Sequence, residues 1–173
     1  IMEFGALICK PKNALCNACP IHNICGAYKN QNIYKLPVKK QKKAPVKRYF
    51  NYLVIEKNQQ YAFEKRTQKD IWNNLYQFPL IETNINLTTE KLVKDNVWKN
   101  IFSTKKVTIS KISEQYVHIL SHQKIYVRFI HIELDDKTLR SQFNNIVYSN
   151  LNNLQLPIAR IIEKYIDKNM LQK

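Results

Sequence analysis

The chain has 173 residues, 45% of them hydrophobic, which suits one domain of ordinary size with a small appended module and excludes two large domains. Its hydrophobic runs are short, and charges interrupt every window of about twenty residues, which excludes a transmembrane helix and a signal peptide. The formal net charge of +15 favours a polyanionic partner over an acidic small molecule. We therefore expect a soluble intracellular protein without membrane contact.

The first elements in the chain carry most of this charge. Residues 1–48 hold ten Lys and Arg and a single acid, Glu3, which leaves them with +9 of the total. The opening run IMEFGALI predicts the last turns of a helix, and because no initiator methionine stands first, we expect a fragment of a longer protein. Residues 9–25 predict a loop-rich module, and IHNICGAYKN predicts one short helical turn.

A basic segment follows this module. The stretch YKLPVKKQKKAPVKR contains Pro37, Pro45 and seven basic residues, which predicts an extended, solvated linker over residues 29–48. Its charge has two interpretations that composition leaves open, a surface for a polyanion or a disordered basic linker.

The hydrophobic pattern changes at residue 49. YFNYLVIE and QYAFEKR, separated by KNQ, predict an antiparallel hairpin, and DIWNNLYQFPLIE predicts a short strand broken by Pro79. TTEKLVKDNVWKNIF predicts a helix with a threonine cap, and VTISKISEQYVHIL and QKIYVRFIHIEL predict a strand pair around Ser121 and His122. DKTLRSQF predicts a helical turn and NIVYSN a last strand. PIARIIEKYI predicts a closing helix with Pro157 at its first position.

These elements predict an α+β domain over residues 49–173. We expect a mixed or antiparallel sheet with flanking helices, preceded by the small four-cysteine module.

The cysteines are confined to that module, with the spacing C-x6-C-x2-C-x5-C. In a reducing compartment four clustered thiols favour a metal site over disulfides. Structural zinc sites usually pair two C-x2-C hooks, whereas only one is present here. The spacing therefore favours a 4Fe-4S cluster, with zinc or free thiols as the alternatives. Lys10 and Lys12 stand between the first two cysteines, either as phosphate contacts or as solvated charges.

MEFGALICKPKNALCNACPIHNIC closely resembles the iron-sulfur loop of the endonuclease III and MutY group of helix-hairpin-helix DNA glycosylases. The resemblance implies a 4Fe-4S cluster, and it implies that Lys10 and Lys12 lie in a loop pressed against DNA phosphates. The implied ligands of the cluster are Cys9, Cys16, Cys19 and Cys25.

The remainder of the chain resembles the extension of MutY-type adenine glycosylases, a Nudix-like domain that senses 8-oxoguanine opposite adenine. IWNNLYQFPLIE is similar to the family's G-L-W-E-F-P segment, with Asn74, Tyr76 and Gln77 in place of Gly, Trp and Glu. VHILSHQKIYVRF is similar to its H-x-F-S-H segment: His118, Ser121 and His122 match, and Leu120 replaces Phe. The implied organisation is the end of a glycosylase domain (1–28), a linker (29–48) and a Nudix-like domain (49–173).

The resemblance assigns lesion recognition to Leu120, Ser121 and His122. A serine hydroxyl and an imidazole can distinguish 8-oxoguanine, which has a hydrogen on N7 and an acceptor oxygen O8, from guanine. The alternative is that Ser121 and His122 merely form a polar turn between two strands. We take His22, His118 and His131 as structural or surface residues, because none stands beside a convincing partner in the sequence.

The resemblance further implies a parent enzyme of base excision repair that hydrolyses the N-glycosidic bond of adenine. Its catalytic residues are expected upstream of Ile1, so we predict that this chain binds double-stranded DNA with 8-oxoguanine:adenine or guanine:adenine mismatches weakly and does no chemistry. We expect a monomer in the bacterial cytoplasm, associated with the nucleoid. The linker is where repair-protein partners would bind.

Two alternatives belong to other classes. A Nudix pyrophosphohydrolase needs a glycine-containing loop and several carboxylates for a divalent metal, but the corresponding stretch offers Glu82, Glu90 and Asp95 and no glycine. The Nudix box is therefore absent. The other alternative is a metal-stabilised module that binds nucleic acid or a protein without glycosylase function.

Overall fold

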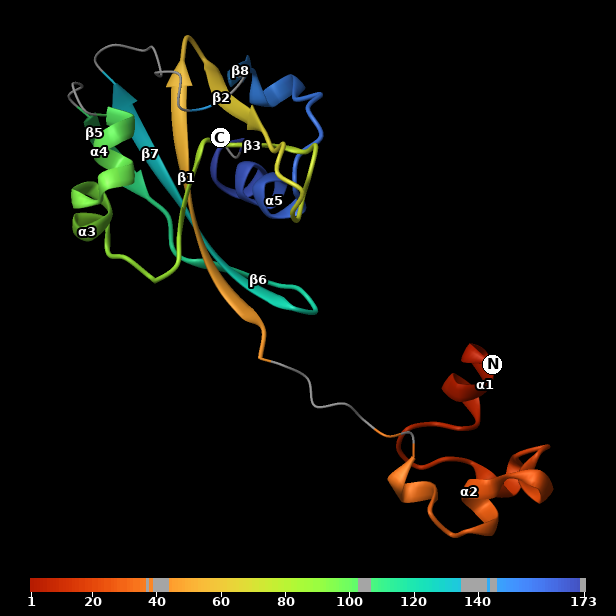
Figure 1. The fold of residues 1–173 in the computed structure, drawn as a ribbon. Coiled ribbons are helices and arrows are strands. Elements are labelled where there is room, and N and C mark those ends of the chain that lie inside the picture. Colours follow the sequence, from red (N-terminus) through yellow and green to blue (C-terminus); the bar gives the residue numbers. More distant parts are fainter. Residues whose placement is uncertain (37, 39–43, 103–106, 135–142, 144–145, 172–173) are drawn as a thin grey trace. The chain divides into compact units, whose positions relative to one another are not determined.

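The computed structural model describes residues 1–36, 38, 44–102, 107–134, 143 and 146–171 (Figure 1). The chain divides into two compact units, Ile1–Lys43 and Ala44–Lys173, which we describe separately. Within the described residues, no helix is both long enough and apolar enough to cross a membrane.

The first unit consists of short helices, and none of them contains a buried residue. The helix expected at the start is confirmed as α1 (Met2–Leu7), and the short turn after the cysteines is α2 (Gly26–Lys29). The 3-10 turns are η1 (Cys16–Ala18), η2 (His22–Ile24) and η3 (Ile33–Lys35). Because η3 lies within residues 29–48, that range is not uniformly extended; its turn is closed by the bond from the Leu36 N–H to the Ile33 carbonyl.

The second unit is built on a mixed sheet, which confirms the α+β prediction. Its centre is the parallel pair of β1 and β7, whose register runs from Val46↔Gln123 to Ile55↔Ile132. Antiparallel strands extend the sheet from this pair: β2 and β4 pair with β1, β5 and β6 pair with β7, and β3 and β8 pair with β2. The strands are β1 (Val46–Lys57), β2 (Gln60–Lys65), β3 (Tyr76–Gln77), β4 (Leu80–Thr83), β5 (Val107–Ile112), β6 (Tyr116–Ile119), β7 (Gln123–Leu134) and β8 (Ile146–Ser149).

The predicted hairpins form, but two segments that were each predicted as one strand are divided. VTISKISEQYVHIL forms β5 and β6, which both pair with β7, and between them Ser113 donates its N–H to the Phe129 carbonyl and accepts the Phe129 N–H on Oγ, both at 2.9 Å. Asn58 and Gln59 join β1 to β2 with φ values of 51° and 62°, the left-handed pair that a two-residue hairpin turn requires. The segment predicted as one broken strand is two strands, β3 and β4. Pro79 separates them, and its carbonyl oxygen accepts a bond from the Leu53 N–H at 2.8 Å.

The helices of the second unit differ from the sequence prediction at their boundaries. The helix expected over residues 88–102 is divided into α3 (Thr89–Lys94) and α4 (Asn96–Phe102), because Asp95 is extended and its Oδ1 accepts from the Val97 N–H. The closing helix α5 (Arg160–Asn169) begins after Pro157, since the Pro157 carbonyl accepts a bond from the sheet instead. A 3-10 turn, η4 (Leu151–Asn153), precedes it. Most of the predicted DKTLRSQF turn lies outside the described residues.

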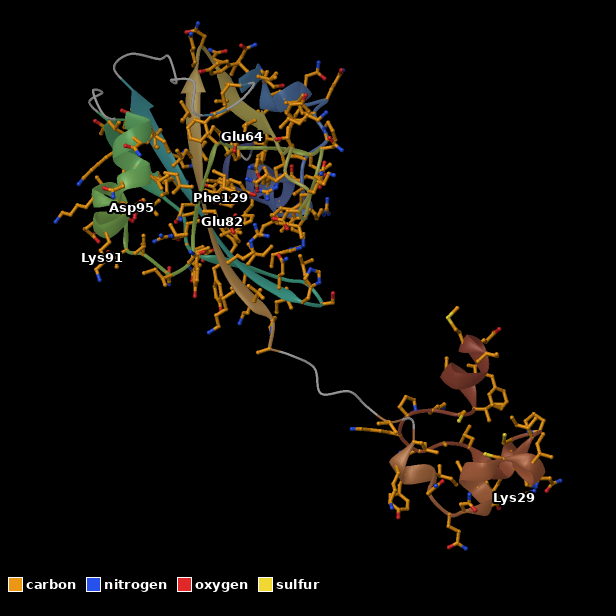
Figure 2. The ribbon with its side chains drawn as sticks, viewed as in Figure 1. Lys29, Glu64, Glu82, Lys91, Asp95 and Phe129 are labelled. Carbon is orange, nitrogen blue, oxygen red and sulfur yellow. The ribbon has the colours of Figure 1, made fainter. Side chains whose placement is uncertain are left out.

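Two hydrophobic clusters cover the two faces of the sheet. The first packs α5 on one face, where the Phe129 and Tyr165 rings stack with centroids 3.6 Å apart (Phe129 is labelled in Figure 2). The second packs α3 and α4 on the other face, where Leu92 and Trp98 lie against Leu53 and Ile130. Both clusters are anchored by alternate residues of β1 and β7, as expected for strands buried on both faces.

Candidate nucleic-acid interface

The turn between β6 and β7 presents two exposed polar side chains. The Leu120 N–H donates to the Gln123 carbonyl at 2.8 Å, which leaves Ser121 and His122 at the tip of the hairpin. Leu120 itself is half-buried and packs against the first hydrophobic cluster. The three residues singled out in the sequence therefore lie together, with the leucine turned toward the core and the polar pair toward solvent.

The two tip side chains contact each other. Ser121 Oγ lies 3.1 Å from His122 Nδ1. When the hydroxyl donates to Nδ1, the ring carries its proton on Nε2, so Nε2–H remains a donor and the serine oxygen remains an acceptor. The tip can then offer one donor and one acceptor side by side.

Strand β1 holds the tip in place. The Val46 N–H donates to the His122 carbonyl at 3.0 Å, and Arg48 Nη1 donates to Gln123 Oε1 at 3.1 Å. On the core side of the hairpin, the rings of His118 and Trp72 lie 5.4 Å apart. The backbone of the tip is therefore tied to the central strand pair.

Arg48 is an anchor that the sequence did not indicate, because it stands at the end of the basic run. Its Nε and Nη2 donate to the two Glu82 oxygens at 2.6 and 2.8 Å, and its Nη1 lies 2.6 Å from Asp70 Oδ2. The guanidinium also lies 4.9 Å from the centroid of the Phe50 ring. The hydrogen bond to Glu82 raises the pKa of Arg48, so this side chain stays charged at every accessible pH.

Replacing Arg48 by alanine is expected to destabilise the second unit by roughly 2–3 kcal/mol, since Glu82 and Asp70 lose a charged donor in a largely covered site. Urea unfolding measures this change. Arg160→Ala is the matched control: its ion pair to Glu163 is exposed, so the unfolding free energy should barely change. Equal effects of the two substitutions would contradict the anchor role.

The four cysteines line one apolar hollow in the first unit. The hollow has a volume of about 440 Å³, and its other walls include Phe4, Ile8 and Leu15. Among the described residues, no three His, Cys, Asp or Glu side chains are grouped closely enough to hold a metal ion. Four soft thiol donors around one apolar space nevertheless suit an iron-sulfur cluster in their chemistry.

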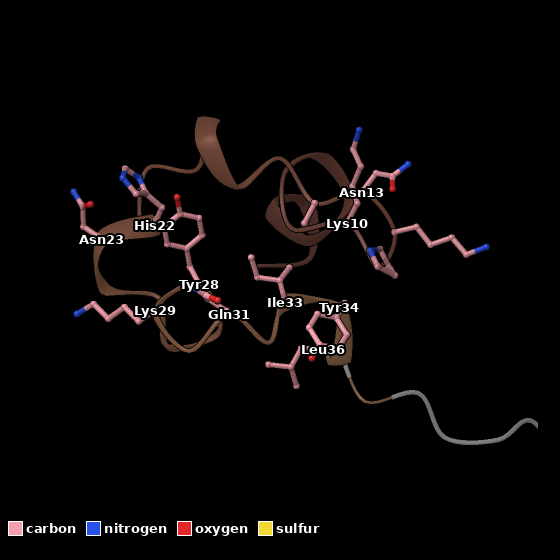
Figure 3. Close-up of a pocket in the computed structure, with 13 residues that line it drawn as sticks. Lys10, Asn13, His22, Asn23, Tyr28, Lys29, Gln31, Ile33, Tyr34 and Leu36 are labelled. Carbon is pink, nitrogen blue, oxygen red and sulfur yellow. The ribbon is translucent and has the colours of Figure 1, made fainter.

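Lys10 and Lys12 are exposed on the loop that follows Cys9. The loop turns at Asn13, whose φ of 55° is left-handed. Together with Lys29, which the sequence did not single out, the two lysines line a hollow of about 1010 Å³, and none of the described residues that line it is acidic (Figure 3). The three lysines make this hollow electropositive.

The histidines outside the tip have structural contacts, as expected. His22 Nδ1 lies 2.9 Å from the Cys19 carbonyl, and His131 Nε2 lies 2.7 Å from the Tyr165 hydroxyl. Burial lowers the pKa of His131, so its ring is neutral at physiological pH.

The carboxylates weighed for nucleotide hydrolysis lie on separate elements. Glu82 binds Arg48, Glu90 lies in the first turn of α3 and Asp95 begins α4; Figure 2 shows Asp95 apart from Glu64 and Glu82. Glu64 accepts from Gln77 Nε2 at 2.9 Å and from the Leu80 N–H at 3.1 Å, and burial raises its pKa. In the part of the chain that the structure describes, these groups form no carboxylate cluster.

Comparison with known proteins places these features in a family context. The family model described as "NUDIX domain" matches residues 51–168. An adenine DNA glycosylase of Buchnera aphidicola subsp. Schizaphis graminum is 37% identical over 138 residues, which are 78% of this chain and 34% of that protein. An adenine DNA glycosylase of Buchnera aphidicola subsp. Baizongia pistaciae is 32% identical over 170 residues, 95% of this chain and 46% of that protein. The chain thus spans less than half the length of these relatives.

Two solved structures share the fold. The C-terminal domain of mouse MUTYH, in complex with human PCNA, has a TM-score of 0.52 and 11% identity over 69% of this chain and 85% of that chain. The E. coli ORF135 protein has a TM-score of 0.52 and 13% identity over 75% of this chain and 96% of that chain. At such low sequence identity, the similarity to these two structures shows the shared fold and nothing further.

Proposed function

The chain belongs to the NUDIX domain family, and on this premise we propose that it is the C-terminal part of an adenine DNA glycosylase, recognising 8-oxoguanine opposite misincorporated adenine. The observation that carries the proposal is the similarity to an adenine DNA glycosylase over 95% of the chain, which has to extend across both compact units. The hydrolysis of the adenine N-glycosidic bond is proposed for the whole enzyme. This chain would contribute recognition of the substrate and not bond cleavage.

The tip of the β6–β7 hairpin is the proposed lesion contact. 8-Oxoguanine differs from guanine in having an N7–H donor and an O8 acceptor, and the tip can supply the complementary set. The Ser121 oxygen would accept from N7–H, and His122 Nε2–H would donate to O8. Guanine has an acceptor at N7 and no oxygen on C8, so it would lose both bonds. Leu120, half-buried below the tip, would support the turn from the core side.

The first unit is proposed to bind the DNA backbone. Cys9, Cys16, Cys19 and Cys25 would hold a 4Fe-4S cluster, which when bound supplies folding free energy to a unit whose described helices and turns contain no buried residue. The loop after Cys9 would then direct Lys10 and Lys12 toward phosphates. We further propose that the protein acts as a monomer in the cytoplasm, at the nucleoid where its substrate lies.

The experiment is a comparison of two labelled duplexes, one with a central 8-oxoguanine:adenine pair and one with guanine:adenine, titrated with this chain in a fluorescence anisotropy assay. We expect tighter binding of the 8-oxoguanine duplex at every salt concentration, with the same salt dependence for both, because phosphate contacts carry no information about the base. Equal affinity for the two duplexes would refute the sensing role.

A further inference from the structure

The sheet extension formed by β6, β7 and the start of β1 has two different faces. Arg48 and Ile125 belong to the face that continues into the first hydrophobic cluster. On the opposite face, the register aligns two rows of side chains across the three strands. We call this surface the open face; its residues are Lys47, Lys124 and Ile119 in one row and Tyr49, Tyr126 and Val117 in the next.

The open face is a continuation of a covered one. Farther along the same strands, Leu53 and Ile130 are buried beneath α3 and α4 in the second cluster. This cover ends at Arg128, whose Nη2 donates to Asn51 Oδ1 at 2.7 Å and to the Leu87 carbonyl at 2.6 Å. Beyond this arginine, β6, β7 and the start of β1 continue past the helices (Figure 1).

The exposed fractions of two apolar side chains show where the cover by α3 and α4 ends. Val117 is 47% exposed and Ile119 is 71% exposed, although both are β-branched residues in a paired strand. The described residues therefore leave this end of the sheet face uncovered.

The polar groups of the open face are two ammonium groups and two tyrosine hydroxyls, and the aromatic rings contact one another. The rings of Tyr49 and Tyr126 stack at 5.0 Å and 13°, and Lys124 Nζ lies 5.2 Å from the Tyr126 centroid. The six residues include two lysines, two tyrosine hydroxyls and no acid. Ammonium and hydroxyl donors of this kind bind phosphate oxygens, and short apolar side chains between them suit the sugar edges of a nucleic acid strand.

We propose that the open face binds the phosphate backbone of the DNA strand beside the nucleotide contacted by the hairpin tip. The proposal rests on the proposed function, because Lys124 is paired with Ile119 immediately behind the Leu120–Gln123 turn, so the open face begins directly behind the tip that carries Ser121 and His122. A phosphate backbone is favoured over a protein partner. The cores of protein interfaces are depleted in lysine, whereas neither lysine of this face has an acidic partner among the described residues.

The test is the salt dependence of duplex binding by the 173-residue chain. Each phosphate contact contributes about 0.9 to the slope of log K against log salt, so Lys47→Gln with Lys124→Gln should reduce the slope by about 1.8 for both duplexes. Affinity should fall by the same factor for 8-oxoguanine:adenine and guanine:adenine, which leaves their ratio unchanged. Lys47→Arg with Lys124→Arg keeps the cations and should restore the slope. The control is Lys91→Gln with Lys94→Gln, the same change of charge on the exposed side of α3.

The outcomes separate this inference from the function on which it rests. The phosphate-binding role of the open face is overturned if the Lys47/Lys124 variant keeps the slope, or if the Lys91/Lys94 control loses as much of it. A retained preference for the 8-oxoguanine duplex in that case still supports the sensing role of the tip. A reduced slope specific to Lys47 and Lys124 supports the face even if the two duplexes bind equally, a result that would overturn the sensing role alone. Circular dichroism melting verifies that each variant is folded.

Discussion

Replacing Ser121 and His122 together by alanine is expected to remove the preference for the 8-oxoguanine:adenine duplex, so that both duplexes bind equally. Each tip contact should be worth roughly 1–3 kcal/mol of discrimination, a factor of about 5 to 150 in relative affinity. The fold should be unaffected, because both side chains are exposed and the turn is held by backbone bonds. Fluorescence anisotropy with the two labelled duplexes measures the ratio directly.

Single substitutions resolve how the two side chains cooperate. Because Ser121 Oγ lies within 3.1 Å of His122 Nδ1, the hydroxyl orients the ring, and Ser121→Ala should weaken the contribution of His122 as well. The two single effects should therefore be non-additive in a double-mutant cycle. Ser110→Ala, at an exposed position of β5, is the control and should keep the full preference. A double variant that still discriminates would show that the lesion is read elsewhere.

Loss of a single cysteine is expected to unfold the first unit. None of its helices or 3-10 turns contains a buried residue, so a hydrophobic core cannot stabilise it. Metal binding at small structural sites contributes roughly 10–16 kcal/mol in zinc-finger peptides, and a cluster would have a comparable role here. Cys16→Ser should therefore abolish the cluster and make residues 1–43 sensitive to protease. The second unit should retain its unfolding transition, because it has its own core.

Chemical analysis of the purified chain decides which metal is present. We expect about four iron and four sulfide per chain together with absorbance in the visible range, all lost in Cys16→Ser. Asn23→Ser, an exposed position in the same loop, should leave both the iron content and the protease resistance unchanged. A colourless chain with one zinc would contradict the cluster, and a Cys16→Ser variant that resists protease would contradict folding by metal.

Hydrophobic periodicity predicted most of the second unit. The β6–β7 hairpin was predicted because an apolar alternation on both sides of Ser121 and His122 needs only a local turn to pair. The segment similar to G-L-W-E-F-P also depends on a local backbone preference. Asn74 replaces glycine and has a φ of 66°, a conformation that asparagine tolerates better than most residues. Such features depend on neighbours in the chain and can be inferred from the sequence.

Element boundaries depended on distant partners and were less predictable. Pro157 is a suitable first residue for a helix, yet α5 begins at Arg160 because the Pro157 carbonyl accepts the Tyr76 N–H from a strand some eighty residues earlier. Arg48 likewise was counted with the linker charges. Its anchoring role arises only when β4, β7 and the loop before β3 bring Glu82, Gln123 and Asp70 around it.

The sequence by itself determined the fold class, the clustered thiols with their intervening lysines, and the polar pair between two strands, because each is expressed in local spacing and periodicity. Tertiary structure alone decided that Lys47 and Tyr49 share a face with Lys124 and Tyr126, since the parallel register of β1 and β7 joins segments that are far apart in the chain. It also decided where the cover of α3 and α4 ends, and hence which part of the sheet the described residues leave uncovered.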